Sequence, residues 1–158
     1  MKVKNYDNSM KSVWQDMFVQ YFQKDLKVEL SEKILKEKVC SFILEQWSKD
    51  VVFISMLVLN DDVIGFAIYQ IDTPESDWCK RPGWGFIREF YIDDAYRRNG
   101  YGKHLINVIE RDLLSRHVEQ IYLTSDDAVS FWEKCGYSDE GADSGGMHTL
   151  TKVMGKTQ

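Results

Sequence analysis

Two apolar, β-branched segments separated by a short polar turn constrain the fold more than any other feature of this sequence. The segments are residues 51–59 and 63–71, and Asn60-Asp61-Asp62 lies between them. Apolar β-branched runs are typical of partly buried strands, and Asn and Asp favour turns because their side chains bond nearby backbone groups. The pattern predicts a hairpin of two partly buried strands in the middle of the chain.

The chain before this hairpin has the spacing of helices. Asn8 or Ser9 is expected to cap a first helix and Ser31 a second, and a short strand is expected near Val3. Apolar residues recur three and four positions apart in both helices, which predicts one buried side for each. The expected buried residues are Val13, Trp14, Met17, Phe18, Tyr21 and Phe22 in the first helix, and Ile34, Leu35, Val39, Phe42, Ile43 and Trp47 in the second.

The chain after the hairpin alternates between strands and helices. In order, we expect a polar loop at 73–83, a strand at 85–92, a helix at 101–116, a strand at 121–124, a short helix at 128–135, a glycine-rich loop and a last strand at 147–153. The helix at 101–116 has one apolar stripe (Leu105, Ile106, Ile109, Leu113), with Lys103, His104, Asn107, Glu110 and Arg111 on the other side. This order predicts a single α/β domain over residues 1–158, with a mixed, mostly antiparallel sheet and helices on both faces.

Charge and cysteine content exclude several classes of function. The formal net charge is −5 at pH 7, and an acidic surface repels phosphates, so we expect no nucleic-acid partner, whereas a cationic amine is tolerated. Cys40, Cys79 and Cys135 lie far apart without a CxxC pair, so neither disulfides nor a metal site is expected. The first ten residues are polar and the longest apolar run is short, so we expect a cytoplasmic protein without a membrane partner.

The segment Arg97-Arg98-Asn99-Gly100-Tyr101-Gly102 joins a predicted strand to the amphipathic helix. Glycines allow a tight turn there, and the first amides of a helix favour an anion because they lack partners within the helix. Two arginines add donors suited to phosphate oxygens. The segment therefore predicts a pyrophosphate site, although a simple turn with solvated arginines is the alternative from these six residues alone. A Walker loop is absent, and Leu105 occupies the third glycine position of a dinucleotide loop.

Two motifs at a characteristic separation resemble the GNAT superfamily of N-acetyltransferases. Arg97-x-x-Gly100-x-Gly102 matches the signature of that superfamily, which is Gln or Arg, two free positions, Gly, one free position, and Gly or Ala. Residues 128–137, Ala-Val-Ser-Phe-Trp-Glu-Lys-Cys-Gly-Tyr, resemble its later A-I-x-x-Y-x-K-x-G-F stretch. The resemblance covers residues 51–137, and residues 89–93 occupy the place of the central strand of the superfamily.

This resemblance implies acetyl-CoA as the acyl donor, lying along the strand at 86–92 with its pyrophosphate on the amides of Arg98 to Lys103. A backbone amide near Tyr91 or Ile92 would stabilise the developing oxyanion. Ser125 stands where many relatives have an asparagine that touches the pantetheine arm. The cofactor-binding residues implied in this way are Phe90, Tyr91, Ile92, Arg97, Arg98, Asn99, Gly100, Tyr101, Gly102, Lys103, Ser125 and Trp132.

The implied reaction is direct attack of a neutral primary amine, on a small molecule or a peptide, on the thioester. Most amines are protonated at neutral pH, so a base must take a proton. Glu89 is the best-placed carboxylate for this role, and strand alternation puts it on the same face as Ile87 and Tyr91. Asp126 and Asp127 are the next candidates for the base. The identity of the amine stays open, and a homodimer is compatible with the sequence.

The sequence departs from the pattern of the superfamily at Trp132, where many relatives have a tyrosine that protonates the leaving thiolate. Tryptophan does not serve as a proton donor in this sense, so either another group such as Tyr137 donates or the thiolate leaves unprotonated. A catalytically impaired module that binds acetyl-CoA is therefore the alternative function.

Several other chemically active or aromatic side chains have simpler interpretations. Cys135 is expected to pack, and we do not expect His148, at the start of the last strand, to face the site. Trp78, Trp84 and Phe86 either line an acceptor pocket or pack together, and packing is the simpler interpretation.

Overall fold

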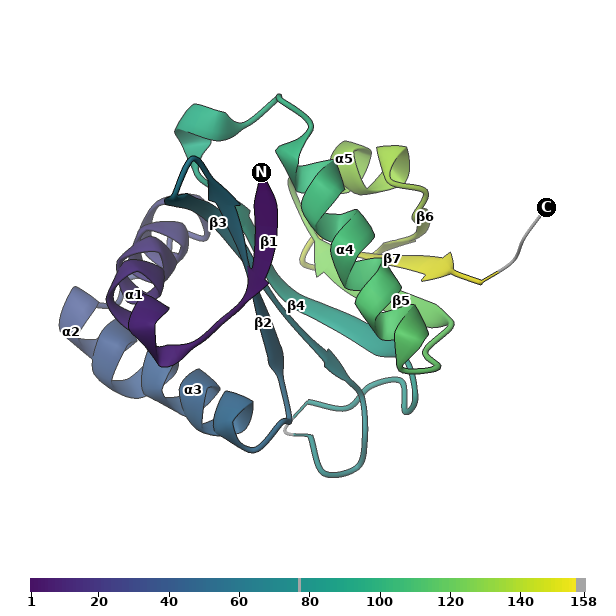
Figure 1. Cartoon of the computed structure of the whole chain (residues 1–158). Helices are drawn as coiled ribbons and strands as arrows, with labels where there is room; N and C mark the ends of the chain where they lie inside the picture. Colours follow the sequence, from purple (N-terminus) through teal and green to yellow (C-terminus); the bar gives the residue numbers. More distant parts are fainter. Residues whose placement is uncertain (77, 156–158) are drawn as a thin grey trace. The chain divides into compact units, whose positions relative to one another are not determined.

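The computed structural model describes residues 1–76 and 78–155 of the 158-residue chain, and their elements are labelled in Figure 1. The chain divides into two compact units, which we describe separately. Unit 1 comprises Met1–Ile68 and Glu89–Gly102, and unit 2 comprises Tyr69–Arg88 and Lys103–Gln158.

The elements follow the order expected from the sequence. Unit 1 holds β1 (Lys2–Asn5), α1 (Lys11–Gln20), α2 (Glu32–Ile34), α3 (Ser41–Ser48) and β2 (Phe53–Leu59). Unit 2 holds β5 (Gln120–Ser125), α5 (Val129–Lys134), β6 (Ser138–Ala142) and β7 (His148–Val153). Three elements run through both units, namely β3 (Asp62–Ile71), β4 (Gly85–Ile92) and α4 (Tyr101–Ser115).

The strands of the described residues form one sheet in the order β1-β2-β3-β4-β5-β7-β6. β4 and β5 are parallel, whereas β1 with β2, β5 with β7, and β6 with β7 are antiparallel. The prediction of a mixed, mostly antiparallel α/β fold is confirmed. The edge strand β6 was not specified by the sequence, because all five of its residues are exposed and it lacks an apolar alternation.

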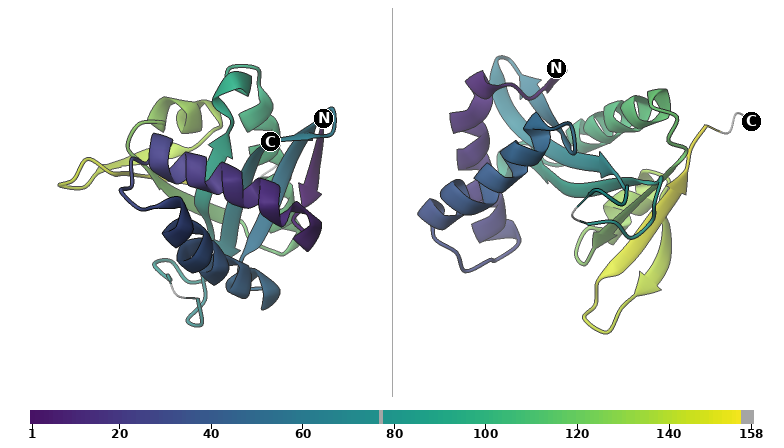
Figure 2. Two further views of the ribbon diagram at one scale, coloured as in Figure 1. Left: turned by 90° about the vertical axis from the view of Figure 1, so that its left-hand side faces the viewer. Right: turned by 90° about the horizontal axis from the view of Figure 1, so that it is seen from below.

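The core of unit 1 is rich in aromatic rings. α1 and α3 lie beside β2 and β3 in both views of Figure 2, and their inward side chains meet those of the strands. Trp14, Phe18 and Phe66 are fully buried, and their ring centroids lie 5.3–6.3 Å apart. Buried aromatic rings contribute large apolar areas as well as specific edge and stacking contacts, so this cluster fixes α1 against the sheet.

The start of the first helix differs from the prediction. Asp7 is the capping residue, rather than Asn8 or Ser9, and its carboxylate accepts the backbone amide of Ser9 at 2.8 Å. A 3₁₀ turn at Asn8–Met10 then leads into α1. Val13 is 48% exposed, so its expected place on the buried side was wrong.

Two π-helical turns shift the buried side of the N-terminal helices. They lie at Tyr21–Asp25 and Leu35–Cys40. The expected cap at Ser31 is confirmed, because its hydroxyl accepts the amide of Ile34 at 3.1 Å. A π turn adds a residue to each hydrogen-bonded ring, so the three-and-four spacing no longer marks one face. Ile34 and Phe42 are exposed for this reason, and their predicted burial was wrong.

The predicted hairpin and amphipathic helix are confirmed. Asn60 and Asp61 have φ values of 50° and 68°, as in the left-handed turns that match strand twist, and Asp62 already belongs to β3. The four residues of the apolar stripe of α4 are fully buried. Glu110, on the other side of the helix from this stripe, is only 12% exposed, and its carboxylate forms an ion pair with Lys152.

A buried carboxylate organises the loop between β3 and β4 in unit 2. Asp72 is fully buried, and its oxygens accept the Gln70 side-chain amide, the backbone amides of Lys80 and Arg81, and the Tyr122 hydroxyl. Buried charge is tolerated only where hydrogen bonds replace water, and this set replaces it. Within the described residues, no helix is both long and apolar enough to cross a membrane.

We predict that Asp72→Asn lowers the free energy of unfolding by about 2–4 kcal/mol, because an amide placed among donors leaves one of them unsatisfied. The Gln70 amide group cannot simply reverse, since its nitrogen also donates to Trp78 and its oxygen accepts from Arg88. Urea unfolding measures the change. Asp126→Asn makes the same substitution at an exposed position and is expected to cost less than about 0.5 kcal/mol. Equal stability of the two variants would contradict the role of Asp72.

Candidate functional site

The predicted site residues lie on three kinds of element. Glu89 to Ile92 end β4, Arg97 to Gly100 form a loop, Tyr101 to Lys103 form the first turn of α4, Ser125 ends β5 and Trp132 lies in α5. The part in unit 1 and the part in unit 2 are described in turn.

The end of β4 presents Glu89 and Tyr91 to the helical side of unit 1. Both contact Tyr21 of the first π turn, Glu89 through a hydrogen bond and Tyr91 through a ring contact at 5.4 Å between centroids. The predicted strand alternation of these two residues is therefore confirmed. Arg88 directly precedes Glu89 in β4. Its guanidinium donates a hydrogen bond to Gln70 within unit 2.

The Tyr21 hydroxyl donates to Oε2 of Glu89 at 3.2 Å. Burial, and next the negative charge of Glu89, raise the pKa of Tyr21 far above its usual range, while the Phe90 amide opposes the rise. The hydroxyl consequently stays protonated at any working pH and acts as the donor. Glu89 is held as an acceptor at the edge of the aromatic core and is only partly buried.

A close approach of backbones fixes the position of this strand end. A β-carbon on Gly65 of β3 would lie 2.5 Å from the Tyr91 carbonyl oxygen, so only glycine fits there. Immediately beyond, the amide of Asp93 donates to the Ile64 carbonyl at 2.7 Å. β4 is thus held against β3 up to the residue where the loop begins.

Arg97 braces that loop from within unit 1. Its Nε donates to the Ile92 carbonyl at 2.7 Å, its terminal nitrogen donates to Asp25 at 2.5 Å, and its guanidinium lies 5.5 Å from the centroid of the Tyr91 ring. The sequence presents this guanidinium as a phosphate donor, and in the structure it is engaged with protein groups. Its planar fork suits this simultaneous contact with a carbonyl, a carboxylate and a ring.

The loop backbone turns sharply before α4. Arg98 and Gly100 have φ values of 65° and 81°, in the left-handed region, and the Asn99 side chain donates to the carbonyls of Tyr96 and Arg97. These residues are exposed. Because the first amides of a helix lack partners within it, the start of α4 directs donors and the positive end of its dipole outward. An anion of the size of a phosphate group is stabilised at such a place.

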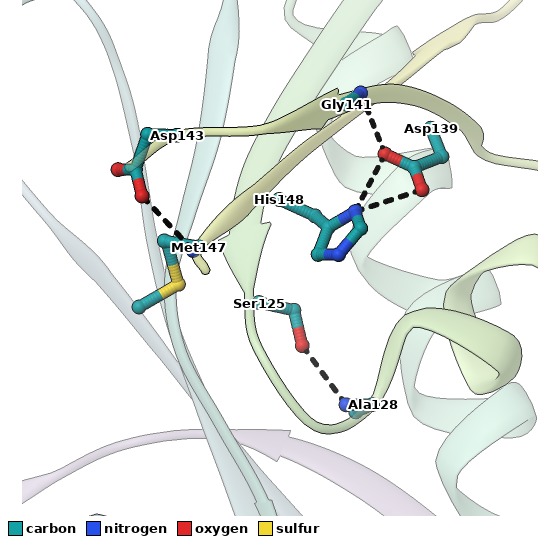
Figure 3. A network of polar contacts seen from close by, with 7 residues as sticks. All are labelled: Ser125, Ala128, Asp139, Gly141, Asp143, Met147 and His148. Atoms are coloured by element: carbon teal, nitrogen blue, oxygen red, sulfur yellow. Dashed lines mark hydrogen bonds and ion pairs between the residues drawn. The ribbon is translucent and has the colours of Figure 1, made fainter. Parts of the chain in front are cut away.

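The predicted residues of unit 2 gather around the start of α5. The Ser125 hydroxyl accepts the amide of Ala128 at 3.2 Å, as Figure 3 shows, so it caps the turn into the helix. Trp132 is buried, with its ring in edge contact with Phe131 and Tyr137. The first turn of α5 and the end of β5 are therefore joined by Ser125.

Tyr137 is engaged as a hydrogen-bond donor in the same unit. Its hydroxyl donates to Glu110 at 2.9 Å, and Lys152 donates to the same carboxylate at 3.1 Å. Burial, and next the charge of Glu110, raise the pKa of Tyr137 far above its usual range. This environment makes Tyr137 a poor proton donor to a ligand.

The other reactive, aromatic and acidic residues that the sequence singled out are either packed in the protein or exposed. Burial raises the pKa of the Cys135 thiol, as expected for a packing residue rather than a nucleophile. Trp84 and Phe86 pack against the Tyr122 ring, which supports the packing interpretation, whereas Trp78 is exposed. Asp126 and Asp127, the other candidates for the base, are exposed. Within residues 1–76 and 78–155, no cluster of three or more His, Cys, Asp or Glu side chains has the arrangement of a metal site.

The sequence missed two side chains that organise the site, Tyr21 and Asp25. A tyrosine within an apolar stripe signals a hydroxyl that needs a partner, because buried tyrosines bond their polar end. That partner, Glu89, lies 68 positions away, and no local pattern identifies it.

The chain matches a family of known proteins over most of its length. The model of the "Acetyltransferase (GNAT) family" matches residues 11–137. A spermine/spermidine N(1)-acetyltransferase of Bacillus subtilis (strain 168) is 26% identical over 104 residues, which cover 62% of this chain and 68% of that protein.

Solved structures share the fold at low sequence identity. The PaiA N-acetyltransferase of Thermoplasma acidophilum, in complex with coenzyme A, is similar with a TM-score of 0.72 and 15% identity over 97% of this chain and 99% of that one. The ribosomal-protein-alanine N-acetyltransferase of Brucella melitensis has a TM-score of 0.75 and 13% identity over 98% and 100%.

We predict that Gly100→Asp abolishes the stabilisation that acetyl-CoA gives to the protein, because the new carboxylate repels the pyrophosphate. At about 100 times Kd, acetyl-CoA is expected to raise the Tm of the wild type by roughly 5–10 °C. Gly83→Asp is a matched control, since Gly83 has a φ of 86° against 81° for Gly100 and neither added β-carbon meets an atom within 4 Å. Thermal unfolding with and without acetyl-CoA measures both. An equal rise in Tm with acetyl-CoA in the two variants would show that the pyrophosphate does not bind at this loop.

Proposed function

Because the chain belongs to the acetyltransferase (GNAT) family, whose model matches residues 11–137, we propose that it moves the acetyl group of acetyl-CoA to a primary amine of a small molecule or a peptide. Family membership makes the chain an N-acetyltransferase with acetyl-CoA as its donor. The matched range contains residues of both compact units, which supports the proposal that residues 1–158 act as a single domain.

In this proposal, the pyrophosphate of acetyl-CoA binds the outward amides of Arg98 to Lys103. The left-handed turn at Gly100 and the brace at Arg97 support this placement, because they fix the loop before a ligand arrives. The pantetheine arm runs along Phe90 to Ile92, where a backbone amide stabilises the oxyanion. In unit 2, Ser125 and Trp132 stand at the positions that the family uses near the arm and the sulfur.

Glu89 is proposed as the base, and the hydrogen bond from Tyr21 is the single observation that carries this assignment. The amine nitrogen bonds to the carbonyl carbon, the carbon–sulfur bond breaks, and its electron pair stays on sulfur. Glu89 takes the proton that the amine loses, directly or through a water molecule. Because burial and the charge of Glu89 raise the pKa of Tyr21, its hydroxyl stays neutral and holds the carboxylate in one orientation without a competing charge.

The acceptor proposed for the first assays is a polyamine. A relative that is 26% identical is a spermine/spermidine N(1)-acetyltransferase, and this chain has a formal net charge of −5, which favours cationic acceptors. Assays with spermidine, a monoamine of similar length and a peptide N-terminus distinguish the acceptor classes by kcat/KM.

Trp132 favours a second candidate function, a module that binds acetyl-CoA without turnover. The indole at the position of the usual tyrosine is buried among Phe131 and Tyr137 rather than presenting an acidic hydroxyl. Amine-dependent release of CoA separates the two functions. Release above the rate of hydrolysis supports the transferase, whereas binding without release supports the module.

We predict that Glu89→Gln lowers kcat by ~10²–10⁴-fold near neutral pH, because the amide keeps the shape and removes the base. The loss should shrink at high pH, where more of the amine is already neutral. A pH–rate profile of both proteins with the same acceptor measures this. If kcat of the variant stays within a factor of about three of the wild-type value at every pH, the loss is much smaller than a missing base causes. Glu89 is then not the base.

We predict that Tyr21→Phe lowers kcat about tenfold and moves the acidic limb of the profile to higher pH. Loss of a hydrogen bond to the ionised carboxylate favours its protonated form, so the base is deprotonated only at a higher pH. Tyr69→Phe is the matched control, because Tyr69 also donates to a carboxylate, that of Asp112 at 2.6 Å in unit 2. A Tyr21→Phe profile with the same limbs as the control would show that Tyr21 does not position the base.

A further inference from the structure

The first π turn of unit 1 carries two side chains that hold different parts of the proposed site. Tyr21 begins this turn, and Asp25 ends it. The amide of Leu26 donates to the Tyr21 carbonyl at 3.1 Å, so one hydrogen-bonded ring contains both residues. Single π turns of this kind occur frequently at functional sites. A displacement at one end of the turn is passed to the other end through this ring.

The two side chains of the turn have different partners. The Tyr21 hydroxyl donates to Glu89, whereas the Asp25 carboxylate accepts a hydrogen bond from Arg97 at 2.5 Å. Glu89 lies on β4, and Arg97 lies in the loop between β4 and α4. The π turn is therefore joined to the proposed base at one end and to the proposed pyrophosphate loop at the other.

Tyr91 closes these contacts into a ring. Its buried side chain lies 5.4 Å from the Tyr21 ring and 5.5 Å from the Arg97 guanidinium, measured from the ring centroid. Burial raises the pKa of Tyr91 to about 12, the charges of Asp93 and Asp25 add to the rise, and that of Arg97 opposes it. Closely packed neighbours transmit displacements to one another, so the members of this ring do not move independently.

Arg97 carries the same constraint to the backbone at the end of β4. Its Nε donates to the Ile92 carbonyl at 2.7 Å, and the amide of Asp93 donates to the Ile64 carbonyl at 2.7 Å. The peptide group that joins Ile92 to Asp93 is thus held at both of its polar atoms. The position of the Arg97 side chain therefore affects both the strand end and the loop that follows it.

Asp94 offers Arg97 a second carboxylate, but its support is weaker than that of Asp25. Asp94 lies 3.5 Å from the guanidinium and is 88% exposed, whereas Asp25 lies at 2.5 Å and is 30% exposed. Water and salt screen exposed ion pairs, so they contribute little. Asp94 is also only three positions before Arg97, on the same loop. Asp25, which is 72 positions away, ties the loop to another element.

Building on the proposed function, we propose that Asp25 is a positioning residue that links the donor loop to the base. Through Arg97 it holds the loop that receives the pyrophosphate of acetyl-CoA, and through the π turn it carries this constraint to Tyr21 and Glu89. Donor binding then steadies the base. Coupling of this kind is reciprocal, so a π turn that is held in place also strengthens donor binding.

Amide hydrogen exchange with and without saturating CoA tests this link without an acceptor. The probes are the amides of Leu26 and Val28, which donate to carbonyls of the first π turn. The second π turn, Leu35–Cys40, is the internal reference, because it reports the slowing that CoA gives to unit 1 as a whole. In the wild type, CoA is expected to slow exchange at the probes about threefold or more beyond this reference, because opening the turn separates Asp25 from a loop that the ligand holds.

Variants assign the extra slowing to the ion pair. Asp25→Asn and Arg97→Gln should each abolish it, since both break the link, and Gln is a residue that the signature allows at 97. Asp25→Glu keeps a carboxylate and should retain it. Asp94→Asn is the matched control, because it also removes an anion beside Arg97 but leaves the contact with the turn intact. It should retain the wild-type pattern.

Kinetics with an acceptor that the wild type uses give a second readout. Asp25→Asn should lower kcat about fivefold and raise KM for acetyl-CoA by a similar factor, since it loosens both ends of the link. Combined with Tyr21→Phe, it should lower kcat by less than the product of the two single effects, because both changes act on Glu89 through one turn.

The outcomes separate this inference from the proposed function. If bound CoA slows exchange neither at residues 98–102 nor at the probes, the donor placement fails and the inference fails with it. If CoA slows exchange at residues 98–102 but leaves the probes at the level of the reference, only the link is overturned. Extra slowing that persists in Asp25→Asn, or that Asp94→Asn abolishes equally, would also overturn the role of Asp25.

Discussion

The guanidinium of Arg97 joins the end of β4, the π turn after α1 and the loop before α4. It bonds the Ile92 carbonyl and the Asp25 carboxylate and lies over the Tyr91 ring. In our proposal, the loop offers its amides to a pyrophosphate. The contacts of Arg97 order the loop before a ligand arrives, and a binding site that is already ordered loses less entropy on binding. Gly100 completes the turn with a backbone conformation that side chains with a β-carbon rarely adopt. The proposed site in unit 1 therefore depends on an arginine whose side chain bonds protein groups.

Tyrosine hydroxyls hold carboxylates at several points of this chain, and exposure decides what each pair can do. Tyr122 donates to Asp72, which is fully buried and also accepts backbone amides, so this carboxylate orders a loop. Tyr21 donates a hydrogen bond of the same kind to Glu89 at the end of β4. The Glu89 carboxylate is only partly buried. A carboxylate that keeps access to a ligand can exchange a proton with it, and a sealed one cannot. The same hydrogen bond thus serves stability in unit 2 and, in our proposal, catalysis in unit 1.

Local patterns in the sequence predicted the elements well, and pairings between distant residues escaped them. The hairpin around Asn60 and the stripe of α4 follow from periodicity and turn chemistry over a few residues. The π turns were not foreseen, because they replace the helical period that the prediction relies on, and they expose Ile34 and Phe42. The loop at Gly100 was found because its residues are contiguous. The supports of that loop and of Glu89 come from Asp25 and Tyr21, which tertiary packing alone brings close.

The central claim is that the loop amides bind the pyrophosphate of CoA, and amide hydrogen exchange tests it residue by residue. Exchange at Arg98 to Lys103 should be measured for the protein alone, with saturating CoA, and with pantetheine, which lacks the pyrophosphate. CoA is expected to slow exchange at these amides by about tenfold or more, because a bound ligand lowers the population of open states. Pantetheine should leave them unchanged. Unaltered exchange at all of these amides with CoA bound to the protein would contradict the claim.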